Sequence, residues 1–194
     1  MAVSEKEKML SGEFYDSSDL ELKTLREKAH RMCLEFNGLY DTDKKRETIL
    51  SELLDLQGEN IYFQGPVQFD YGCFTKIGKN FYANFNFTCL DSAPVTIGEN
   101  VFVGPNVSIY TPLHPLSYKE RNQYLKADGG FTCKESAKPV VIGDNCWLGG
   151  SVVVCPGVTI GAGCVIGAGA VVTKDMPAGF LCVGNPCKPI RKIE

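Results

Sequence analysis

The 194-residue chain contains only two histidines, His30 and His114, beside nine cysteines. Histidine has an unperturbed pKa of about 6.5, so an imidazole can accept and return a proton near neutral pH. His30 lies on the polar side of a segment with helical periodicity, where a solvated surface position is expected. His114 lies between Leu113 and Pro115, in a segment that interrupts a sequence repeat. His114 is therefore the candidate for acid–base chemistry.

The cysteines show neither a disulfide nor a metal-binding pattern. Their number is odd, and no Cys-x-x-Cys pair occurs among them. Most are expected to be small apolar core residues, and Cys146 and Cys164 fall at inward positions of the repeat. This usage predicts a reducing compartment, hence a cytoplasmic protein, and no metal site.

Charge and hydropathy argue against two classes of partner. The formal net charge of −3 disfavours general binding to nucleic acid or to an anionic membrane surface. No run approaches the roughly 18 apolar residues of a spanning helix, and Met1 to Lys6 lacks the apolar core of a secretory signal. A hydrophobic content of 44% with 22% charged residues is typical of a globular domain.

A six-residue repeat governs the chain from about residue 58 onward. Its longest run consists of aliphatic anchors at intervals of six, namely Ile142, Leu148, Val154, Ile160, Ile166 and Val172. Two shorter runs with the same spacing are Ile77-Ala83-Cys89 and Ile97-Val103-Ile109. Neither the helical period of 3.6 nor strand alternation produces this pattern. It predicts a parallel β-helix, in which three hexapeptides make a coil of about 18 residues around an apolar core.

The repeat is interrupted once on a large scale, in the segment that contains His114. Ile109 and Ile142 lie 33 residues apart, which is not a multiple of six. We therefore predict a loop at about 110–138 that leaves the solenoid, and functional residues concentrate on loops that a rigid scaffold positions. The expected organisation is an N-terminal helical segment, 1–57, followed by the β-helix domain, 58–194.

The N-terminal segment has the pattern of short helices. Two capping boxes are expected at helix starts, Ser4–Glu7 and Ser18–Glu21. The second helix should run until Asn37-Gly38, and a third is expected from about Asp43 to Leu56.

The motifs of the repeat and of its interruption resemble one known family. Asn80 to Asn86 reads NFYANFN, Thr111 to Leu116 reads TPLHPL, and Ile142 to Gly150 reads IGDNCWLGG. With Asp70-Tyr71-Gly72 and Gly184-Asn185-Pro186, they resemble the maltose/galactoside O-acetyltransferases, which are hexapeptide-repeat enzymes with a left-handed β-helix. The chain is more similar to the maltose type, because Asp70 stands where galactoside-type members often carry Ser.

This resemblance implies an activity and an assembly. The activity is transfer of an acetyl group from acetyl-CoA to a hydroxyl of a maltose- or glucose-type sugar, with His114 as general base. Direct transfer needs no covalent enzyme intermediate, so no cysteine nucleophile is required. The assembly is a homotrimer in which each active site lies between two subunits.

The resemblance also implies which residues bind the two substrates. Those expected to bind acetyl-CoA are Asn84, Trp147, Gly150, Ala168, Thr173, Lys174, Lys188 and Arg191. Among them, Asn84 would donate to the developing oxyanion, and the cations of Lys188 and Arg191 suit phosphates. Those expected to bind the sugar are Asp16, Asp70, Tyr82 and Asp91, with Ser92 as the alternative to Asp91. The segment 122–136 is longer than in the family members compared, so no contact is assigned to it.

Other functions of this fold stay open at the level of the sequence. Hexapeptide solenoids also host acetyltransferases for galactosides, antibiotics and serine, and a solenoid can serve as a non-catalytic scaffold. A zinc hydratase would need about three histidine ligands, and His114 is the single histidine after residue 57. Turnover of acetyl-CoA with a sugar, and its loss in His114→Ala, separates an enzyme from a scaffold.

Overall fold

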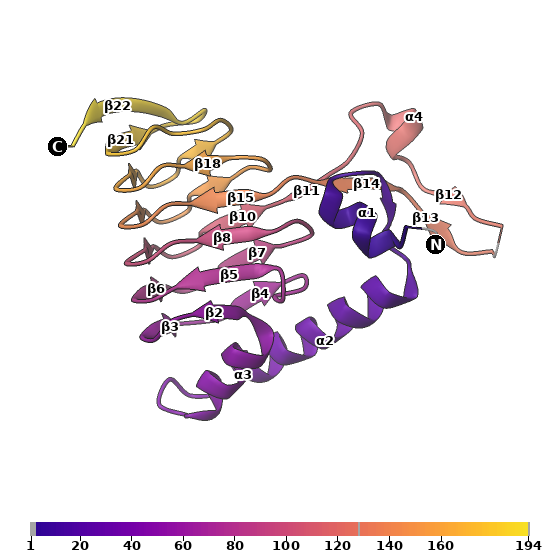
Figure 1. The fold of residues 1–194 in the computed structure, drawn as a ribbon, viewed down its shortest axis with the longest axis horizontal. Helices are drawn as coiled ribbons and strands as arrows, with labels where there is room; N and C mark the ends of the chain where they lie inside the picture. The colour runs from indigo at the N-terminus through magenta and orange to yellow at the C-terminus, as the bar shows by residue number, and fades with distance from the viewer. Residues whose placement is uncertain (1–2, 128, 194) are drawn as a thin grey trace.

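The structure is a computed structural model that describes residues 3–127 and 129–193. Its main body is a parallel β-solenoid, as the predicted fold class requires (Figure 1). Helices lie beneath the first coil, and an arm leaves the solenoid halfway along its length (Figure 1). Among the described residues, no helix has the length and apolarity that crossing a bilayer demands.

Three sheets form the faces of the solenoid, each with one strand per coil. The first face consists of β2 (Asp55–Gln57), β5 (Thr75–Gly78), β8 (Val95–Ile97), β15 (Val140–Ile142) and β18 (Thr159–Ile160). The second consists of β3 (Ile61–Phe63), β6 (Phe81–Ala83), β9 (Phe102–Val103), β16 (Trp147–Leu148), β19 (Val165–Ile166), β21 (Phe180–Val183) and the antiparallel β22 (Lys188–Lys192). The third consists of β4 (Val67–Phe69), β7 (Phe87–Leu90), β10 (Ser108–Tyr110), β17 (Val153–Val154) and β20 (Val171–Val172).

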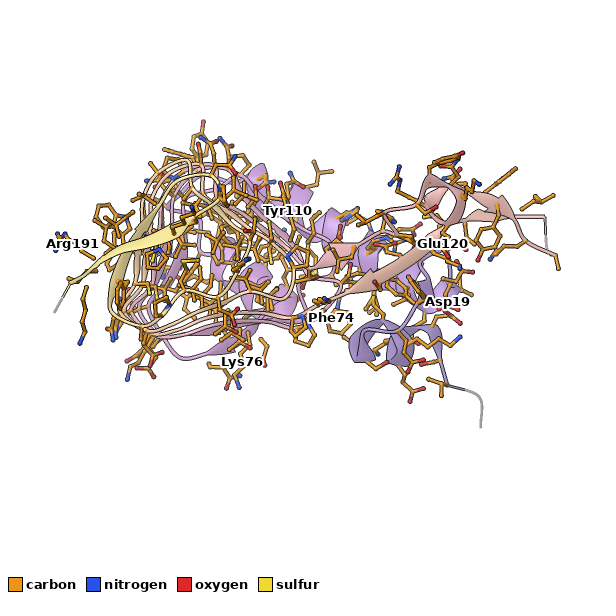
Figure 2. The ribbon with its side chains drawn as sticks, turned by 90° about the horizontal axis from the view of Figure 1, so that it is seen from above. Asp19, Phe74, Lys76, Tyr110, Glu120 and Arg191 are labelled. Atoms are coloured by element: carbon orange, nitrogen blue, oxygen red, sulfur yellow. The ribbon has the colours of Figure 1, made fainter. Side chains whose placement is uncertain are left out.

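The anchors of the six-residue repeat fill the interior of this prism. Every predicted anchor from Ile77 to Val172 is at most 1% exposed, and Cys146 and Cys164 are equally buried. Seen from above, side chains occupy the inside of the stacked coils (Figure 2). The aliphatic residues thus stack coil on coil into one apolar core, which confirms the repeat interpretation.

The first coils are larger than the predicted 18 residues. Pairing joins Ile77 to Ile97, twenty residues later, whereas Ile142 pairs with Ile160, eighteen residues later. The two extra residues lie at the corner between the third and first faces, where Asp91 and Ser92 are buried. There the Asp91 carboxylate accepts the Tyr71 backbone N–H at 2.8 Å and the Thr75 hydroxyl at 3.0 Å. Asp91 therefore ties the widened corner to the preceding coil.

The arm interrupts the solenoid without displacing its coils, as predicted. Ile97 on β8 pairs directly with Ile142 on β15, although the arm lies between them in sequence. The arm contains β11 (Pro112–Leu113), α4 (Tyr118–Arg121), β12 (Tyr124–Leu125), β13 (Phe131–Thr132) and β14 (Lys134–Ala137). β14 lies in a three-stranded sheet between β11 and the N-terminal strand β1 (Tyr15–Asp16). The N-terminal segment therefore braces the returning strand of the arm.

Two helix boundaries differ from prediction. α1 (Glu5–Ser11) begins with the expected capping box at Ser4. α2 (Leu20–Asn37) is capped instead by Asp19, whose carboxylate accepts backbone N–H groups of its first turn, so no capping box forms at Ser18. α3 (Lys45–Leu53) ends before 56, because the chain already enters β2 and pairs with β5. The first coil thus begins slightly before the expected domain boundary at 57/58.

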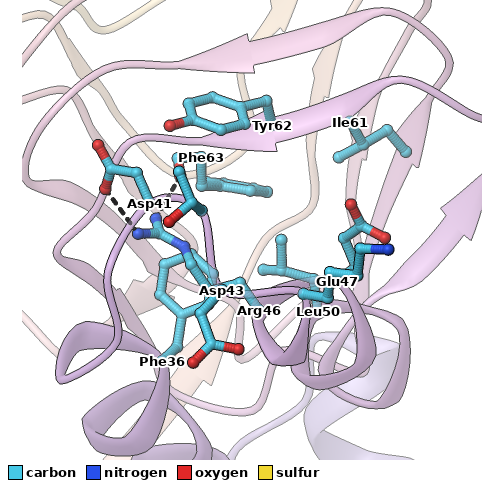
Figure 3. Close-up of a pocket in the computed structure, with 11 residues that line it drawn as sticks. Phe36, Asp41, Asp43, Arg46, Glu47, Leu50, Ile61, Tyr62 and Phe63 are labelled. Atoms are coloured by element: carbon cyan, nitrogen blue, oxygen red, sulfur yellow. Dashed lines mark hydrogen bonds and ion pairs between the residues drawn. The ribbon is translucent and has the colours of Figure 1, made fainter.

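A buried arginine joins α3 to the first coil (Figure 3). The Arg46 guanidinium is 6% exposed and donates to the carbonyl oxygens of Phe63 and Gln64 at 2.7 and 2.9 Å. It also pairs with Asp41 at 2.8 Å and stacks over the Phe36 ring. Arg46 also lines a small cavity, where its guanidinium is bonded to these groups of the chain itself. These bonds hold the helical segment against β3 and the turn that follows it.

Candidate active site

An open cleft lies where the arm leaves the third face. Its volume is about 590 Å³, and its walls include Asp70, Tyr110, Leu113, His114 and Glu135. Asp70 follows β4, Tyr110 ends β10, and the last three belong to the arm. Figure 2 shows Tyr110 at the edge of the solenoid on the side from which the arm extends. The solenoid and the arm therefore build the cleft together.

The His114 ring is held by the neighbouring strand. Its Nδ1 lies 3.1 Å from the backbone carbonyl oxygen of Lys134, on β14 beside β11. A carbonyl can only accept, so this bond requires the proton on Nδ1 and leaves a lone pair on Nε2. The side chain is exposed, which makes that nitrogen accessible to a substrate. Nε2 can therefore act as a proton acceptor.

Two carboxylates face the same cleft as His114. Burial raises the pKa of Asp70, and the nearby Asp91 charge adds to this effect. The Asp70 carboxylate also lies 3.8 Å from Nε2 of His30, so His30 is exposed as expected but is not isolated. Glu135 was missed by the sequence analysis, because only the pairing of β14 with β11 brings it to the cleft. The sequence feature that could have indicated Glu135 is its position in the last part of the predicted loop, where the chain returns to the solenoid.

Two of the predicted sugar ligands lie elsewhere. Asp91 is fully buried and hydrogen-bonded within the corner described above, so its carboxylate has no exposed surface in this chain. The alternative, Ser92, is 2% exposed. Asp16 is partly buried, and both of its carboxylate oxygens accept hydrogen bonds from Ser18, Lys126 and Thr132. Neither aspartate lines the cleft.

Four of the predicted acetyl-CoA residues and the predicted sugar ligand Tyr82 lie on the second face or at its corner toward the third face. Tyr82 and Trp147 belong to an outward ladder of rings in which register joins Tyr62, Tyr82, Phe102 and Trp147. The first two rings are stacked, with centroids 5.9 Å apart. Asn84, Gly150 and Ala168 follow strands of this face at the corner toward the third face. These groups do not line the cleft of His114 in the same chain.

The four remaining predicted residues are exposed near the C-terminal end. Thr173 and Lys174 directly follow β20, and Lys188 and Arg191 lie on the end strand β22. Figure 2 shows Arg191 at the side of the solenoid opposite the arm. One chain thus presents His114, Asp70 and Glu135 in one place and the predicted acetyl-CoA groups in another. Residues 3–127 and 129–193 contain no group of three or more acidic, histidine or cysteine side chains that could hold a metal.

Three family models match separate parts of the chain. Residues 8–55 match a maltose acetyltransferase hexapeptide capping motif. Residues 139–174 match a bacterial transferase hexapeptide model of six repeats, and residues 94–113 match a hexapeptide repeat of succinyl-transferase. The matches coincide with the helical segment and with coils on both sides of the arm.

Known proteins resemble the chain over nearly its full length. Galactoside O-acetyltransferase of Escherichia coli K12 is 39% identical over 97% of this chain and 89% of its own. A maltose O-acetyltransferase structure from Clostridium difficile 630 is 42% identical with a TM-score of 0.90, and both chains are covered completely. A hexapeptide-repeat acetyltransferase from Vibrio cholerae, complexed with acetyl-CoA, is 38% identical with a TM-score of 0.84 and covers 98% and 99% of the two chains.

A left-handed β-helix of hexapeptide repeats with this helical cap defines a class, the hexapeptide-repeat acetyltransferases. The sequence identities of 39–42% over nearly the whole chain then show which family within that class the chain belongs to. The chain belongs to the maltose and galactoside O-acetyltransferase family, and it is an acetyltransferase of that type.

Proposed function

We propose that the chain transfers the acetyl group of acetyl-CoA to a hydroxyl of a maltose- or glucose-type sugar. The observation that carries this proposal is the His114 ring, held through Nδ1 in a cleft that also contains two carboxylates. The carboxyl oxygens of Asp70 and Glu135 would accept hydrogen bonds from sugar hydroxyls. The maltose O-acetyltransferase of C. difficile and the acetyl-CoA complex from V. cholerae support both substrates by similarity.

In the proposed reaction, His114 acts as general base and then as general acid. Nε2 takes the proton of the attacking sugar hydroxyl as its oxygen bonds to the thioester carbonyl carbon. When the carbon–sulfur bond breaks, the same nitrogen returns the proton to the departing thiolate of CoA. The side-chain amide of Asn84 would donate to the oxyanion formed in between. No enzyme–acetyl bond forms, so no cysteine takes part.

We also propose a homotrimer with each site between two subunits. The separation of His114 from the predicted acetyl-CoA groups in one chain supports this assembly. The exposed rings of Phe102 and Trp147 on the second face support it as well, since large exposed apolar surfaces mark contacts with partners. In that assembly Tyr82 would reach the sugar bound beside a neighbour's His114, and Trp147, Gly150, Ala168, Thr173, Lys174, Lys188 and Arg191 would hold the CoA.

We also propose that the protein is located in the cytoplasm. All nine cysteines fall within the described residues, and each is a free thiol. Free thiols in this number are typical of reducing compartments.

Release of CoA thiol from acetyl-CoA, measured with glucose, maltose, galactosides and small amines, tests the proposed activity. Glucose or maltose should be the best acceptors, and His114→Ala should lower turnover on the order of 10²–10⁴-fold because the base is lost. Lys119→Ala, at an exposed position of the same arm, should keep wild-type turnover. Full activity in His114→Ala would refute the mechanism, and an amine as best acceptor would refute the sugar.

A further inference from the structure

The hydroxyl of Tyr15 is a buried polar group without a hydrogen-bond partner. Tyr15 lies on β1, is 4% exposed and packs in one cluster with Met9, Leu22 and Tyr71. In the part of the chain that the structure describes, no other buried side-chain nitrogen or oxygen is left unpaired. A buried hydroxyl without a partner carries a free-energy penalty, so its presence at this position requires an explanation.

Strand pairing places Tyr15 in a row with two residues that line the cleft. Tyr15 stands opposite Glu135, on one side of β14. On the other side of β14, β11 pairs through Leu113 and Ser136. One residue further in that antiparallel register, His114 falls opposite Glu135. Side chains directly opposite each other lie on the same face of a sheet. Glu135 is therefore the middle member of the row, between a buried phenol and the proposed base.

Two polar side chains lie close enough to the phenol to affect its ionisation. Burial raises the pKa of Tyr15 far above its ordinary value, and the Glu135 charge adds to this effect, whereas the Ser92 hydroxyl opposes it. A carboxylate can only accept from the phenol, and a serine hydroxyl can donate to the phenol oxygen. The polar neighbours thus suit a chain of two hydrogen bonds, from Ser92 to Tyr15 and from Tyr15 to Glu135. Active-site hydrogen bonds are often long in the free enzyme and tighten in the substrate complex.

We propose that Tyr15 is a positioning residue of the acceptor site, whose hydroxyl holds the Glu135 carboxylate in the orientation that binds the sugar. The proposal rests on the proposed function, in which Glu135 accepts hydrogen bonds from sugar hydroxyls. Glu135 is only half-buried, so its side chain can turn toward solvent. The phenol ring is fixed by the packing around it. A donor fixed in this way lowers the cost of ordering the carboxylate when the sugar binds.

Steady-state kinetics of Tyr15→Phe, in the thiol-release assay, tests the proposal. The substitution removes the hydroxyl and keeps the ring. The sugar KM should rise about tenfold, while kcat and the KM of acetyl-CoA change less than about twofold, because a contact with the bound sugar acts equally in the ground and transition states. Tyr118→Phe is the matched control, since it removes the hydroxyl of an exposed ring on α4 of the same arm, and it should keep wild-type kinetics. An unchanged sugar KM in Tyr15→Phe would overturn the proposal.

A double-mutant cycle distinguishes action through Glu135 from a general loosening of the fold. In the Glu135→Ala background, Tyr15→Phe should raise the sugar KM less than about twofold further, because the carboxylate that the phenol holds is absent. An equal rise in both backgrounds would overturn the proposal.

The stability of the unliganded protein gives a readout that does not depend on turnover. Tyr15→Phe should leave the free energy of unfolding unchanged or raised, because the hydroxyl is unpaired in the free protein. A clear loss of stability in urea would assign the hydroxyl to the fold and refute a role reserved for the sugar complex. Wild-type protein that acetylates no sugar would instead refute the proposed function, whatever the stability of Tyr15→Phe.

Discussion

Burial makes several thiols of the core poor acids. It raises the pKa of Cys33 and of Cys146 to about 11 each. Burial, followed by the neighbouring Cys164, raises the pKa of Cys182 to about 12. A free thiol has a pKa of about 8.5, so these side chains lose their protons more readily in the unfolded chain than in the folded one. The apolar role assigned to the cysteines from sequence therefore has a thermodynamic consequence.

That consequence is a loss of stability in alkali. The stabilising contribution of these thiols is complete below about pH 8.5 and falls as the pH rises toward the folded-state values, because only the unfolded state is ionised. Each thiol should lower the free energy of unfolding by up to about 1.4 kcal/mol per pH unit in that range. Urea unfolding at pH 7 and 9.5 measures the slope, and Cys146→Ala with Cys182→Ala should reduce it.

The same two variants at pH 6.5 and 7 provide the control. The raised pKa values of Cys146 and Cys182 lie far above this range, and an unfolded thiol with a pKa of about 8.5 is almost fully protonated there, so wild type and variants should show parallel stability profiles. An alkaline slope unchanged by both substitutions would contradict the attribution to buried thiols.

At the scale of the element, spacing predicted the coils but not their size. The anchors at intervals of six, such as Ile142 and Leu148, identify inward positions because a coil has a fixed number of faces. The two extra residues in the early coils lie at the corner where the Asp91 carboxylate accepts the backbone N–H of Tyr71 from the coil beneath. Likewise, Ser18 lost the predicted helix cap to Asp19, since its hydroxyl bonds Asp16. A local sequence pattern does not predict hydrogen bonds of this kind, because the partner is chosen by the folded structure.

Close stacking of coils explains why glycine follows some anchors. A Cβ at Gly98 would overlap Oδ1 of Asp144 on the next coil and lie 2.7 Å from its backbone nitrogen. That carboxylate also accepts the Glu99 N–H at 2.8 Å. Gly98→Ala should therefore cost about 1–3 kcal/mol in unfolding free energy, as overpacking does, measured by chemical denaturation.

Gly38 is the matched glycine outside the stack. It ends α2 with a φ of −86°, and a Cβ there would meet its nearest atoms, backbone oxygens, at 3.6 and 3.7 Å. Gly38→Ala should leave the stability unchanged or slightly raised, because alanine adopts this conformation without strain. Equal losses in the two variants would show that coil-to-coil contact is not the cause.

At the scale of the whole molecule, sequence located the centre of the site better than its surroundings. His114 stood out because a single histidine occurs in the interruption of the repeat. The position of Glu135 depends on the pairing of β14 with β11, and the hydrogen bonds of Asp16 depend on the pairing of β1 with β14, which joins segments more than 100 residues apart. Resemblance named Asp16 and Asp91 as sugar ligands, yet the hydrogen bonds of each carboxylate engage it within the chain. The sequence thus predicted that carboxylates gather near His114, but it did not predict the hydrogen-bond partners of each one.

The proposed sharing of sites between subunits makes a quantitative prediction for mixed assemblies. His114→Ala removes the base from the cleft, and Asn84→Ala removes the proposed oxyanion donor from the second face, so each homogeneous assembly should be nearly inactive. In mixed trimers, an Asn84→Ala chain still supplies His114, and a neighbouring His114→Ala chain still supplies Asn84. Each mixed trimer should restore about a third of its sites, because an intact site needs one particular order of neighbours and that order occurs once in every mixed closed ring.

Co-expression of the two variants under different affinity tags, followed by sequential purification, isolates the mixed assemblies for the thiol-release assay. Two single-variant preparations combined after assembly are the control, and they should stay inactive unless subunits exchange. Sites complete within one chain would leave the mixed assemblies as inactive as their parents, since no chain in them holds both side chains. Recovered turnover would therefore place His114 and Asn84 of different subunits in one active site.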